Sequence, residues 1–312
     1  MTAVLKAADL GVTLPSLPLD RSYDPRYGEA VAQSPLVRRV LAPNPGPFTF
    51  HGTGTYVVGH GRVAVIDPGP LLEAHVDALC RALDGETVTH ILVTHTHSDH
   101  SPAAQPLQRA TGAPTFAFGP HGAGKRRAGI AVEEGGDMAF VPDILLADGE
   151  VIAGDGWTLD CVYTPGHTSN HLCFGLREEQ CLFTGDHVMG WSTTVIVPPD
   201  GDMAQYLESL SRLQRRADRR CYPTHGSPID APADFLARLV EHRHARERQI
   251  DACLARGIVR IRDMVRVIYS EVETHLHPAA AMSVLAHLQH MVASGRAGVD
   301  GDTTLEAVYR PG

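Results

Sequence analysis

This sequence lacks several features that would assign it to common protein classes. Its six cysteines are sparse for a chain of 312 residues, and no two are spaced as CxxC, so a disulfide scaffold is excluded. No window of about 18 apolar residues occurs, which excludes a transmembrane helix. Lys and Arg total 27 against 36 Asp and Glu, a formal net charge of −9, so a generally cationic surface for nucleic acid or anionic lipid is also excluded. The N-terminal residues show no signal-peptide pattern, so we expect reduced thiols and a cytoplasmic location.

The length and composition favour one large globular domain with a small appendix. Apolar residues make up 43% of the chain and charged residues 20%, which is ordinary for a protein with a packed core. We predict a first, larger domain over residues 1–230. Within it, the proline-rich residues 1–46 are expected to form an irregular arm or a strand pair that crosses the surface. A second, helical domain is predicted over residues 231–312.

Short β-branched runs and helical spacings alternate through the first of these domains. Strands are predicted at Thr55–Val58, Val63–Ile66, Val88–Val93, Thr115–Phe118, Trp157–Tyr163, Leu172–Gly175, Gln180–Phe183 and Arg220–Tyr222, and helices at Leu71–Leu83, Pro102–Thr111 and Asp202–Arg216. Residues 119–148 are the least regular stretch and are predicted to form a long loop. Because such loops in a compact domain are often functional, this one is expected to border the active site.

The C-terminal part has the element order of a winged-helix-like domain. Helices are predicted at Ala231–Ala255, Ile261–Ser270 and Ala279–Ala293, followed by a hairpin within Arg296–Tyr309. Residues 241–312 carry nine Arg and nine Asp or Glu, so this part has no net charge. Since neutralisation of phosphates drives nucleic-acid affinity, we expect it to form a wall of the active-site cleft or a homodimer surface instead.

The most informative motif directly follows the apolar run Val88–Val93. Three imidazoles and one carboxylate occur within six residues, at His95, His97, Asp99 and His100. This mixture of nitrogen and oxygen donors is typical of catalytic zinc sites. In an extended segment, alternate side chains point the same way, so His95 and His97 can share one ion while Asp99 and His100 address a second.

Three further candidate ligands lie at the ends of apolar strands, each beside a glycine. They are His167, Asp186 and His225. A glycine next to a ligand permits close backbone approach and unusual φ values. A strand end is also a rigid platform from which a loop projects into a cleft.

This ordered set of donors resembles the metallo-β-lactamase superfamily, whose HxHxDH signature is matched by His95, His97, Asp99 and His100. The resemblance implies a four-layer αβ/βα sandwich with two metal ions at one edge. It also implies that His95, His97 and His167 hold the first ion, that Asp99, His100 and His225 hold the second, and that Asp186 bridges them. Two zinc ions per chain are expected, although iron or manganese could fill the same ligands.

The region that follows Asp186 and the C-terminal helices resemble the β-lactamase-like protein 2 group, which carries a winged-helix-like domain. One branch of that group cleaves single-stranded RNA. A two-metal centre supplies a metal-bound hydroxide as nucleophile, which Asp99 would hold through a hydrogen bond. The candidate substrates are therefore phosphodiesters of single-stranded RNA and small esters or thioesters. A nucleic-acid-binding or regulatory protein with a structural metal site is the alternative, but seven donors leave open positions for water.

Two other groups of residues allow more than one interpretation. His171, four residues after His167, is a candidate catalytic acid, although support of a ligating histidine is the simpler role. The basic triplet Lys125-Arg126-Arg127 is more typical of a solvated loop, but it is the best candidate for contact with an anionic substrate.

Overall fold

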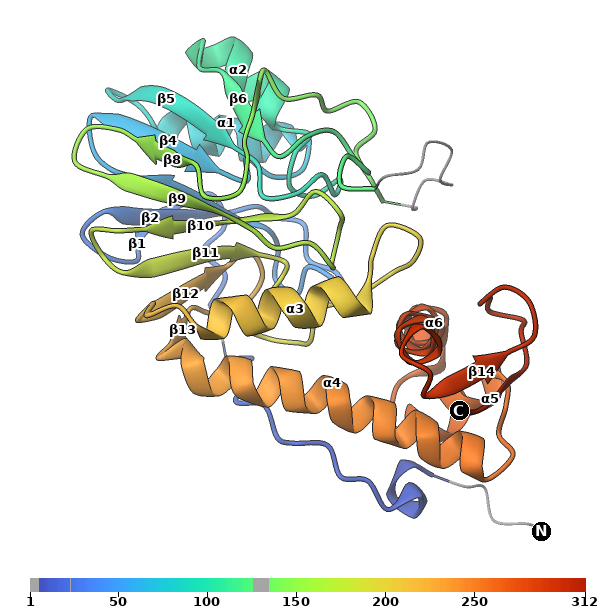
Figure 1. Ribbon diagram of the computed structural model, residues 1–312. Coiled ribbons are helices and arrows are strands. Elements are labelled where there is room, and N and C mark those ends of the chain that lie inside the picture. Colours follow the sequence, from blue (N-terminus) through green and yellow to red (C-terminus); the bar gives the residue numbers. More distant parts are fainter. Residues whose placement is uncertain (1–5, 23, 126–134) are drawn as a thin grey trace.

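The computed structural model describes residues 6–22, 24–125 and 135–312. Two stacked β-sheets lie between helices, and a helical part is attached beyond one end of them (Figure 1). Within the described residues, no helix is both long and apolar enough to cross a membrane.

The first sheet has seven strands that are neighbours in chain order. They are β1 (Ala30–Ala32), β2 (Val37–Leu41), β3 (Gly54–Val58), β4 (Arg62–Ile66), β5 (Thr87–Leu92), β6 (Thr115–Ala117) and β7 (Ile144–Leu145). Pairing is antiparallel from β1 to β4 and parallel from β4 to β7. Because β4, β5 and β6 run the same way, the chain segments after their carboxyl ends lie at one edge of the sheet.

The second sheet has six strands. In spatial order they are β13 (Ile229–Asp230), β12 (Arg220–Pro223), β11 (Cys181–Gly185), β10 (Leu172–Leu176), β9 (Thr158–Tyr163) and β8 (Val151–Ala153). Only the β11–β12 pair is parallel within this sheet. All five residues of β10 and of β11 are buried, as expected for strands covered on both faces.

Helices cover the outer face of each sheet. Helices α1 (Glu73–Ala82) and α2 (Ala104–Thr111) pack on the first sheet, and α3 (Met203–Gln214) with the beginning of α4 (Pro232–Ala255) packs on the second. A third apolar cluster, which includes Tyr56, Phe174 and Phe183, fills the space between the sheets. The predicted four-layer αβ/βα sandwich is therefore confirmed.

The N-terminal residues differ from the expected surface arm. The expected strand pair is present as β1 and β2, but β2 is an inner strand of the first sheet. Val37, Val40 and Leu41 are almost fully buried. Val37, with Leu36 packed beside it, thus joins the intersheet core, and Val40 joins the core under α1 and α2, whereas the 3-10 helix η1 (Ala7–Leu10) lies outside the sheets.

The long loop predicted over residues 119–148 is interrupted by the short edge strand β7. Residues 126–134, which include Arg126 and Arg127, lie outside the described residues. On the C-terminal side of that gap, His97 forms an isolated β-bridge with Gly136, so this loop lies against the histidine motif.

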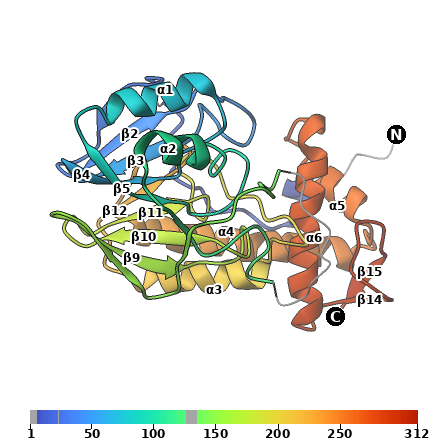
Figure 2. The same cartoon turned by 90° about the horizontal axis from the view of Figure 1, so that it is seen from above.

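The C-terminal part contains the predicted order of helices and hairpin. Its elements after α4 are α5 (Ile261–Ile268), η2 (Thr274–Leu276), α6 (His277–Ala293), β14 (Ala297–Val299) and β15 (Tyr309–Pro311). The two strands pair, and residues 300–308 join them. Seen from above, α5, α6 and this hairpin lie beyond one end of the sandwich (Figure 2).

Helix α4 belongs to both parts of the molecule. Phe235, Leu236 and Leu239 pack into the core beside α3, whereas Ile250 and Leu254 pack into the core of the C-terminal helices. The predicted division between residues 230 and 231 remains a prediction, because this single helix carries residues of both cores.

Candidate metal centre

The histidine motif begins where β5 ends, at the edge of the first sheet. Thr94 is held there by Asp67, which accepts hydrogen bonds from the Thr94 amide at 2.7 Å and from its Oγ1 at 2.8 Å. The chain bends at Thr94, forms an isolated β-bridge at His97 and then turns. His95 and His100 are fully buried, so this short segment fixes both imidazoles within the protein.

Three imidazole nitrogens converge at the first candidate position. His95 Nε2 and His167 Nε2 each lie 3.0 Å from His97 Nδ1. Two of these residues come from the motif after β5, and His167 comes from the loop between β9 and β10. These three donor atoms lie close enough together to hold one metal ion.

A second group forms beside the first. His225 Nε2 lies 3.1 Å and His100 Nε2 lies 3.4 Å from Asp99 Oδ2. Asp186 lies between the groups: its Oδ1 is 3.3 Å from His225 Nε2, and its Oδ2 is 3.8 Å from His167 Nε2. The structure therefore brings together all seven residues that the sequence indicated as ligands.

The outer nitrogen of three of these imidazoles is fixed by an oxygen of the surrounding protein. His167 Nδ1 donates to the Val195 carbonyl at 2.8 Å, and His225 Nδ1 donates to the Gly52 carbonyl at 3.1 Å. His100 Nδ1 donates to Asp67 Oδ2 at 2.9 Å. Because a neutral imidazole has one N–H, Nε2 of each ring then presents a lone pair to the site.

The directions of these lone pairs show whether the residues suit a metal ion. The Nε2 atoms of His100 and His225 face the carboxylates of Asp99 and Asp186, so acceptors face acceptors. His100 Nε2 and Asp186 Oδ1 are buried without a hydrogen-bond partner among the described residues. A divalent cation satisfies all of these atoms at once, and the donor set fits it.

The pKa values of the buried groups also indicate that the site needs positive charge. Burial alone would raise the pKa of Asp186, but His225 and His100 hold this pKa well below its usual range. Burial would lower the pKa of His100, but Asp99 and Asp186 raise it well above its usual range. Without a bound ion, a proton supplies part of the positive charge that the two carboxylates need.

Glycines beside the ligands have the role that the sequence suggested. Gly166, Gly185 and Gly226 all have positive φ, at 135°, 50° and 90°. At Gly166, an added Cβ would lie 2.3 Å from Tyr206 Cα, so a larger residue would displace the loop that carries His167.

Asp67 is a buried site residue that sequence reasoning missed. Besides Thr94 and His100, Thr224 Oγ1 donates to its Oδ2 at 3.0 Å, so Asp67 ties together the loops that carry His100 and His225. In the sequence, Asp67 directly follows the predicted strand Val63–Ile66, and nothing there marks its partners. Its φ of 50° indicates a constrained position, but only the fold shows what it contacts.

His171 lies beneath the proposed ligands and does not line the cavity. Its ring stacks on that of His95 with centroids 5.1 Å apart, and its Nδ1 lies 2.9 Å from Thr164 Oγ1. It is fully buried, and burial followed by the neighbouring His187 and His167 lowers its pKa well below the usual range. This position supports a role in fixing His95, and a catalytic role for His171 stays a prediction.

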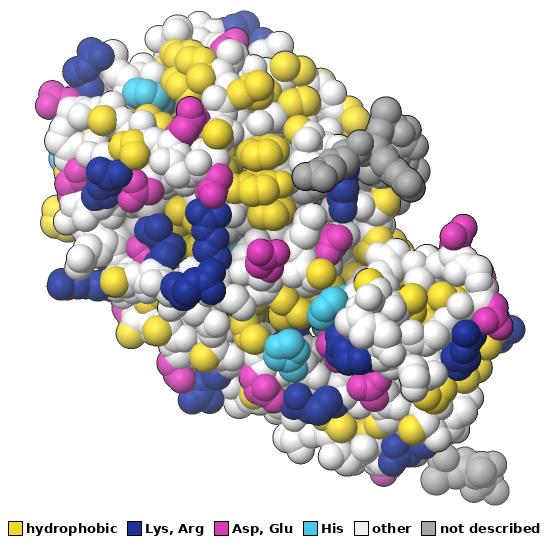
Figure 3. Space-filling model, viewed as in Figure 1, with side chains coloured by type: hydrophobic (Ala, Val, Ile, Leu, Met, Phe, Trp, Pro, Cys, Tyr) yellow, Lys and Arg dark blue, Asp and Glu magenta, His cyan; other side chains and the backbone are white. Residues whose placement is uncertain are grey.

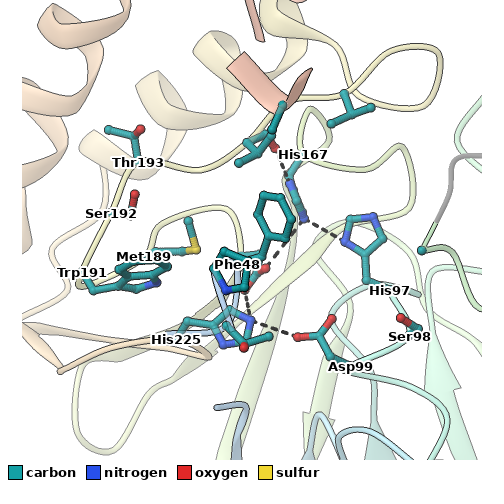
Figure 4. Close-up of a pocket in the computed structure, with 17 residues that line it drawn as sticks. Phe48, His97, Ser98, Asp99, His167, Met189, Trp191, Ser192, Thr193 and His225 are labelled. Atoms are coloured by element: carbon teal, nitrogen blue, oxygen red, sulfur yellow. Dashed lines mark hydrogen bonds and ion pairs between the residues drawn. The ribbon is translucent and has the colours of Figure 1, made fainter. Parts of the chain in front are cut away.

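A cavity of about 350 Å³ opens onto the seven-residue cluster. Its lining residues are Pro47, Phe48, Thr49, His97, Ser98, Asp99, Gly135, His167, Asp186, Met189, Trp191, Ser192, Thr193, Val195, Val197, His225 and Ala279. Met189, Trp191, Ser192 and Thr193 lie on one side and His97, Ser98 and Asp99 on the other (Figure 4). None of the described lining residues is Lys or Arg, and Lys125, the one described member of the basic triplet, is not among them.

Ala279 places the C-terminal part at this cavity, because it belongs to α6. The expectation that this part forms a wall of the cleft is thereby supported. On the face shown in Figure 3, Lys and Arg of the C-terminal part are interspersed with Asp and Glu and form no basic surface there.

Comparison with known proteins finds two families along the chain. The sequence profile of the metallo-beta-lactamase superfamily matches residues 49–225, and that of the beta-lactamase associated winged helix domain matches residues 261–304. A lactamase-like protein from Aspergillus niger is 34% identical, with 76% of this chain and 69% of that protein covered. An atrochrysone carboxyl ACP thioesterase from Aspergillus chevalieri is 33% identical (77% and 75% covered), and a beta-lactamase-like protein 2 homolog from Caenorhabditis elegans is 34% identical (70% of each).

Solved structures share the whole architecture. A beta-lactamase domain protein from Burkholderia ambifaria superposes with a TM-score of 0.75 at 21% identity, over 93% of this chain and 96% of that one. A metallo-beta-lactamase family protein from Thermus thermophilus superposes with a TM-score of 0.71 at 25% identity, over 90% of this chain and 100% of that one. Both likenesses cover the C-terminal helices as well as the sandwich.

Proposed function

We propose that this chain, which belongs to the metallo-beta-lactamase superfamily and is a metal-dependent hydrolase, cleaves acyl thioesters at a two-metal centre. The observation that carries the proposal is the cavity, which joins the cluster of candidate ligands to an apolar wall of Phe48, Met189 and Trp191. An apolar wall beside polar, metal-binding groups suits an acyl chain whose reacting carbonyl must reach the metals. The relative named as an ACP thioesterase supports the same class of substrate.

In this proposal His95, His97 and His167 would hold one ion, Asp99, His100 and His225 would hold the other, and Asp186 would be shared by both. Zinc suits these ligands, and iron or manganese could occupy them. When bound, the two ions supply a water of lowered pKa and Lewis acidity toward the carbonyl oxygen of the substrate.

The protein's own residues prepare this chemistry. Asp99 lies at the cavity edge, where its Oδ2 accepts a hydrogen bond from Thr53 Oγ1 at 3.1 Å. From this position the carboxylate can orient an attacking water and accept its proton. The rings of His100, His167 and His225 are already turned toward the site by their outer hydrogen bonds, so little reorganisation is needed.

Single-stranded RNA is the weaker candidate substrate. Recognition of phosphodiesters relies on Lys and Arg, and the described cavity lining has neither. A regulatory protein with a structural metal site is weaker still, because such sites are closed and this cluster faces a cavity. A homodimer and a cytoplasmic location stay expectations.

The test measures hydrolysis of a panel of acyl-CoA and acyl-N-acetylcysteamine thioesters by zinc-loaded protein, with released thiol as the readout. Asp99→Ala should lower kcat by at least about a hundredfold, since a positioned acid or base contributes about that much. Asp160→Ala is the matched control, because Asp160 is also an aspartate but pairs with Arg177 on the surface.

Labelled single-stranded RNA is assayed in parallel. Protein that holds about two metals per chain and cleaves RNA but no thioester would overturn the proposal. Equal thioester turnover by wild type and Asp99→Ala would show that this centre does not carry the reaction.

A further inference from the structure

A buried arginine of α4 reaches the loop that walls the cavity. Arg243 is 3% exposed, and its Nη2 donates to the Thr194 carbonyl at 2.5 Å. Its guanidinium also lies over the ring of Tyr206 in α3, with Cζ 5.0 Å from the ring centroid. Arg243 therefore joins the long helix shared by both parts of the molecule to the loop after Asp186.

Thr194 and Val195 contact two of the candidate ligands. Thr194 Oγ1 lies 2.8 Å from the carbonyl of Asp186, to which it donates, and 3.1 Å from the carbonyl of His187. The next residue, Val195, supplies the carbonyl that accepts from His167 Nδ1. A shift of the Thr194 carbonyl would thus be transmitted to the ring of His167 and to the backbone of Asp186.

The contacts of Arg243 point into the site rather than toward the helical core. Among the described residues, the buried Nε of this guanidinium has no hydrogen-bond partner, although an unsatisfied buried polar group is costly. What it contacts is the Thr194 carbonyl and the face of Tyr206, whose hydroxyl donates to the His187 carbonyl at 3.0 Å. Both contacts lead to the segment that follows Asp186.

We propose that Arg243 is a positioning residue of the metal centre, which fixes the Thr194–Val195 backbone and through it the orientation of His167 and Asp186. The inference rests on the ligand set of the proposed function. It makes α4, and with it the C-terminal part, a component of the centre rather than an accessory to it.

Arg246 provides a matched control one turn further along α4. It is also buried, at 7% exposure, and its guanidinium lies 4.3 Å from the ring centroid of Tyr269. Its Nη1 donates to Gln249 Oε1, so its contacts lie in the helical part. Loss of either arginine removes a buried, ring-stacked charge, but only loss of Arg243 frees the loop.

The experiment compares the full chain with the variants Arg243→Ala, Arg243→Lys and Arg246→Ala. Affinity for Zn²⁺ is measured by competition with a chelator, and the coordination geometry by the visible absorption spectrum of the Co²⁺-loaded protein. Arg243→Ala should bind at least one ion about ten- to a hundredfold more weakly, as expected when the partner of a ligating residue is lost. Its Co²⁺ spectrum should also change.

Arg243→Lys should recover part of the affinity, because an ammonium can still donate to the Thr194 carbonyl. Arg246→Ala should keep the wild-type affinity and spectrum even if its thermal stability falls. If Arg243→Ala does not fold, Thr194→Val keeps the carbonyl that Arg243 contacts but removes the hydrogen bond from Thr194 Oγ1 to the Asp186 carbonyl, and should also weaken metal binding.

Wild-type affinity and an unchanged Co²⁺ spectrum in Arg243→Ala, or in Thr194→Val in its place, would overturn the proposal. So would an equal loss in Arg246→Ala. These readouts do not depend on the substrate. A wild-type chain that binds two ions but cleaves no thioester would therefore refute the proposed activity and leave the role of Arg243 to be decided by metal affinity. A wild-type chain that binds no ion would refute both.

Discussion

Two clusters of histidines and carboxylates in this protein have similar composition and opposite organisation. In the candidate metal centre, imidazoles surround Asp99 and Asp186 and present lone pairs to them. In the C-terminal part, the buried carboxylate of Glu247 accepts from His290 Nδ1 at 2.8 Å, His287 Nδ1 at 3.3 Å and Arg296 Nη1 at 2.5 Å.

The two clusters differ in the direction of the hydrogen bonds around their carboxylates. At Glu247, N–H groups already point at the carboxylate, so the negative charge is satisfied and no cation is needed. At the metal centre, the N–H groups of His167 and His225 point away, to backbone carbonyls, and a surplus of acceptors remains. The residue types alone would make both clusters candidate metal sites. The hydrogen-bond directions favour a bound cation only at the candidate metal centre.

The largest expected effect comes from removing Asp186, the carboxylate that lies between the two groups of candidate ligands. Asp186→Ala should lower kcat/KM about a thousandfold, because a metal clamp supplies several kcal/mol of transition-state stabilisation. Metal content per chain, measured by elemental analysis, should fall with it. Glu247→Gln should keep the wild-type metal content, and loss of metal in that variant would remove the distinction between the clusters.

A smaller effect, on the stability of the protein, is expected when the charge of Glu247 is removed. Glu247→Gln should lower the free energy of unfolding by about 3 kcal/mol, since it leaves buried donors without their charged partner. Urea unfolding followed by circular dichroism measures this change. A loss below about 1 kcal/mol, within the range of exposed ion pairs, would show that the cluster adds little to the fold.

The pH dependence of stability should come in part from His287. Burial, more than the opposing hydrogen bond to Glu247, lowers the pKa of His287 to about 4. The unfolded chain, with a pKa near 6.5, then binds a proton that the folded chain refuses, so stability falls as the pH falls from about 6.5 toward 4.

Between pH 6.5 and 5 this amounts to about 1.6 kcal/mol for one such histidine. The difference in unfolding free energy between wild type and His287→Gln should shrink by that amount over the same interval. A difference that stays constant with pH would mean that His287 titrates normally in the folded protein.

The smallest expected effect concerns the cavity wall that α6 contributes. Ala279→Phe should lower kcat/KM for thioesters of long acyl chains about tenfold, which corresponds to about 1.4 kcal/mol, because the larger side chain narrows the cavity. Acetyl thioesters should be less affected, and metal content should not change. Equal kcat/KM values for long acyl chains in wild type and variant would place the acyl group elsewhere.

The local pattern of the chain determined much of this architecture. Apolar runs and turn residues predicted most strands and helices, and the spacing of His95, His97, Asp99 and His100 after an apolar run predicted the metal cluster. These signals are local, because side chains near in sequence share one strand end. The order of the later donors, through the resemblance to the family, indicated the same four-layer fold.

Only the tertiary structure decided how the candidate ligands are oriented and what surrounds them. The Gly52 and Val195 carbonyls that fix His225 and His167 leave no mark in the sequence, because almost every residue has a carbonyl. The buried position of Asp67, the contact of Arg243 with Thr194 and the place of Ala279 in the cavity join segments far apart in the chain. The packing of sheets and helices, and not the local pattern, brings these groups together.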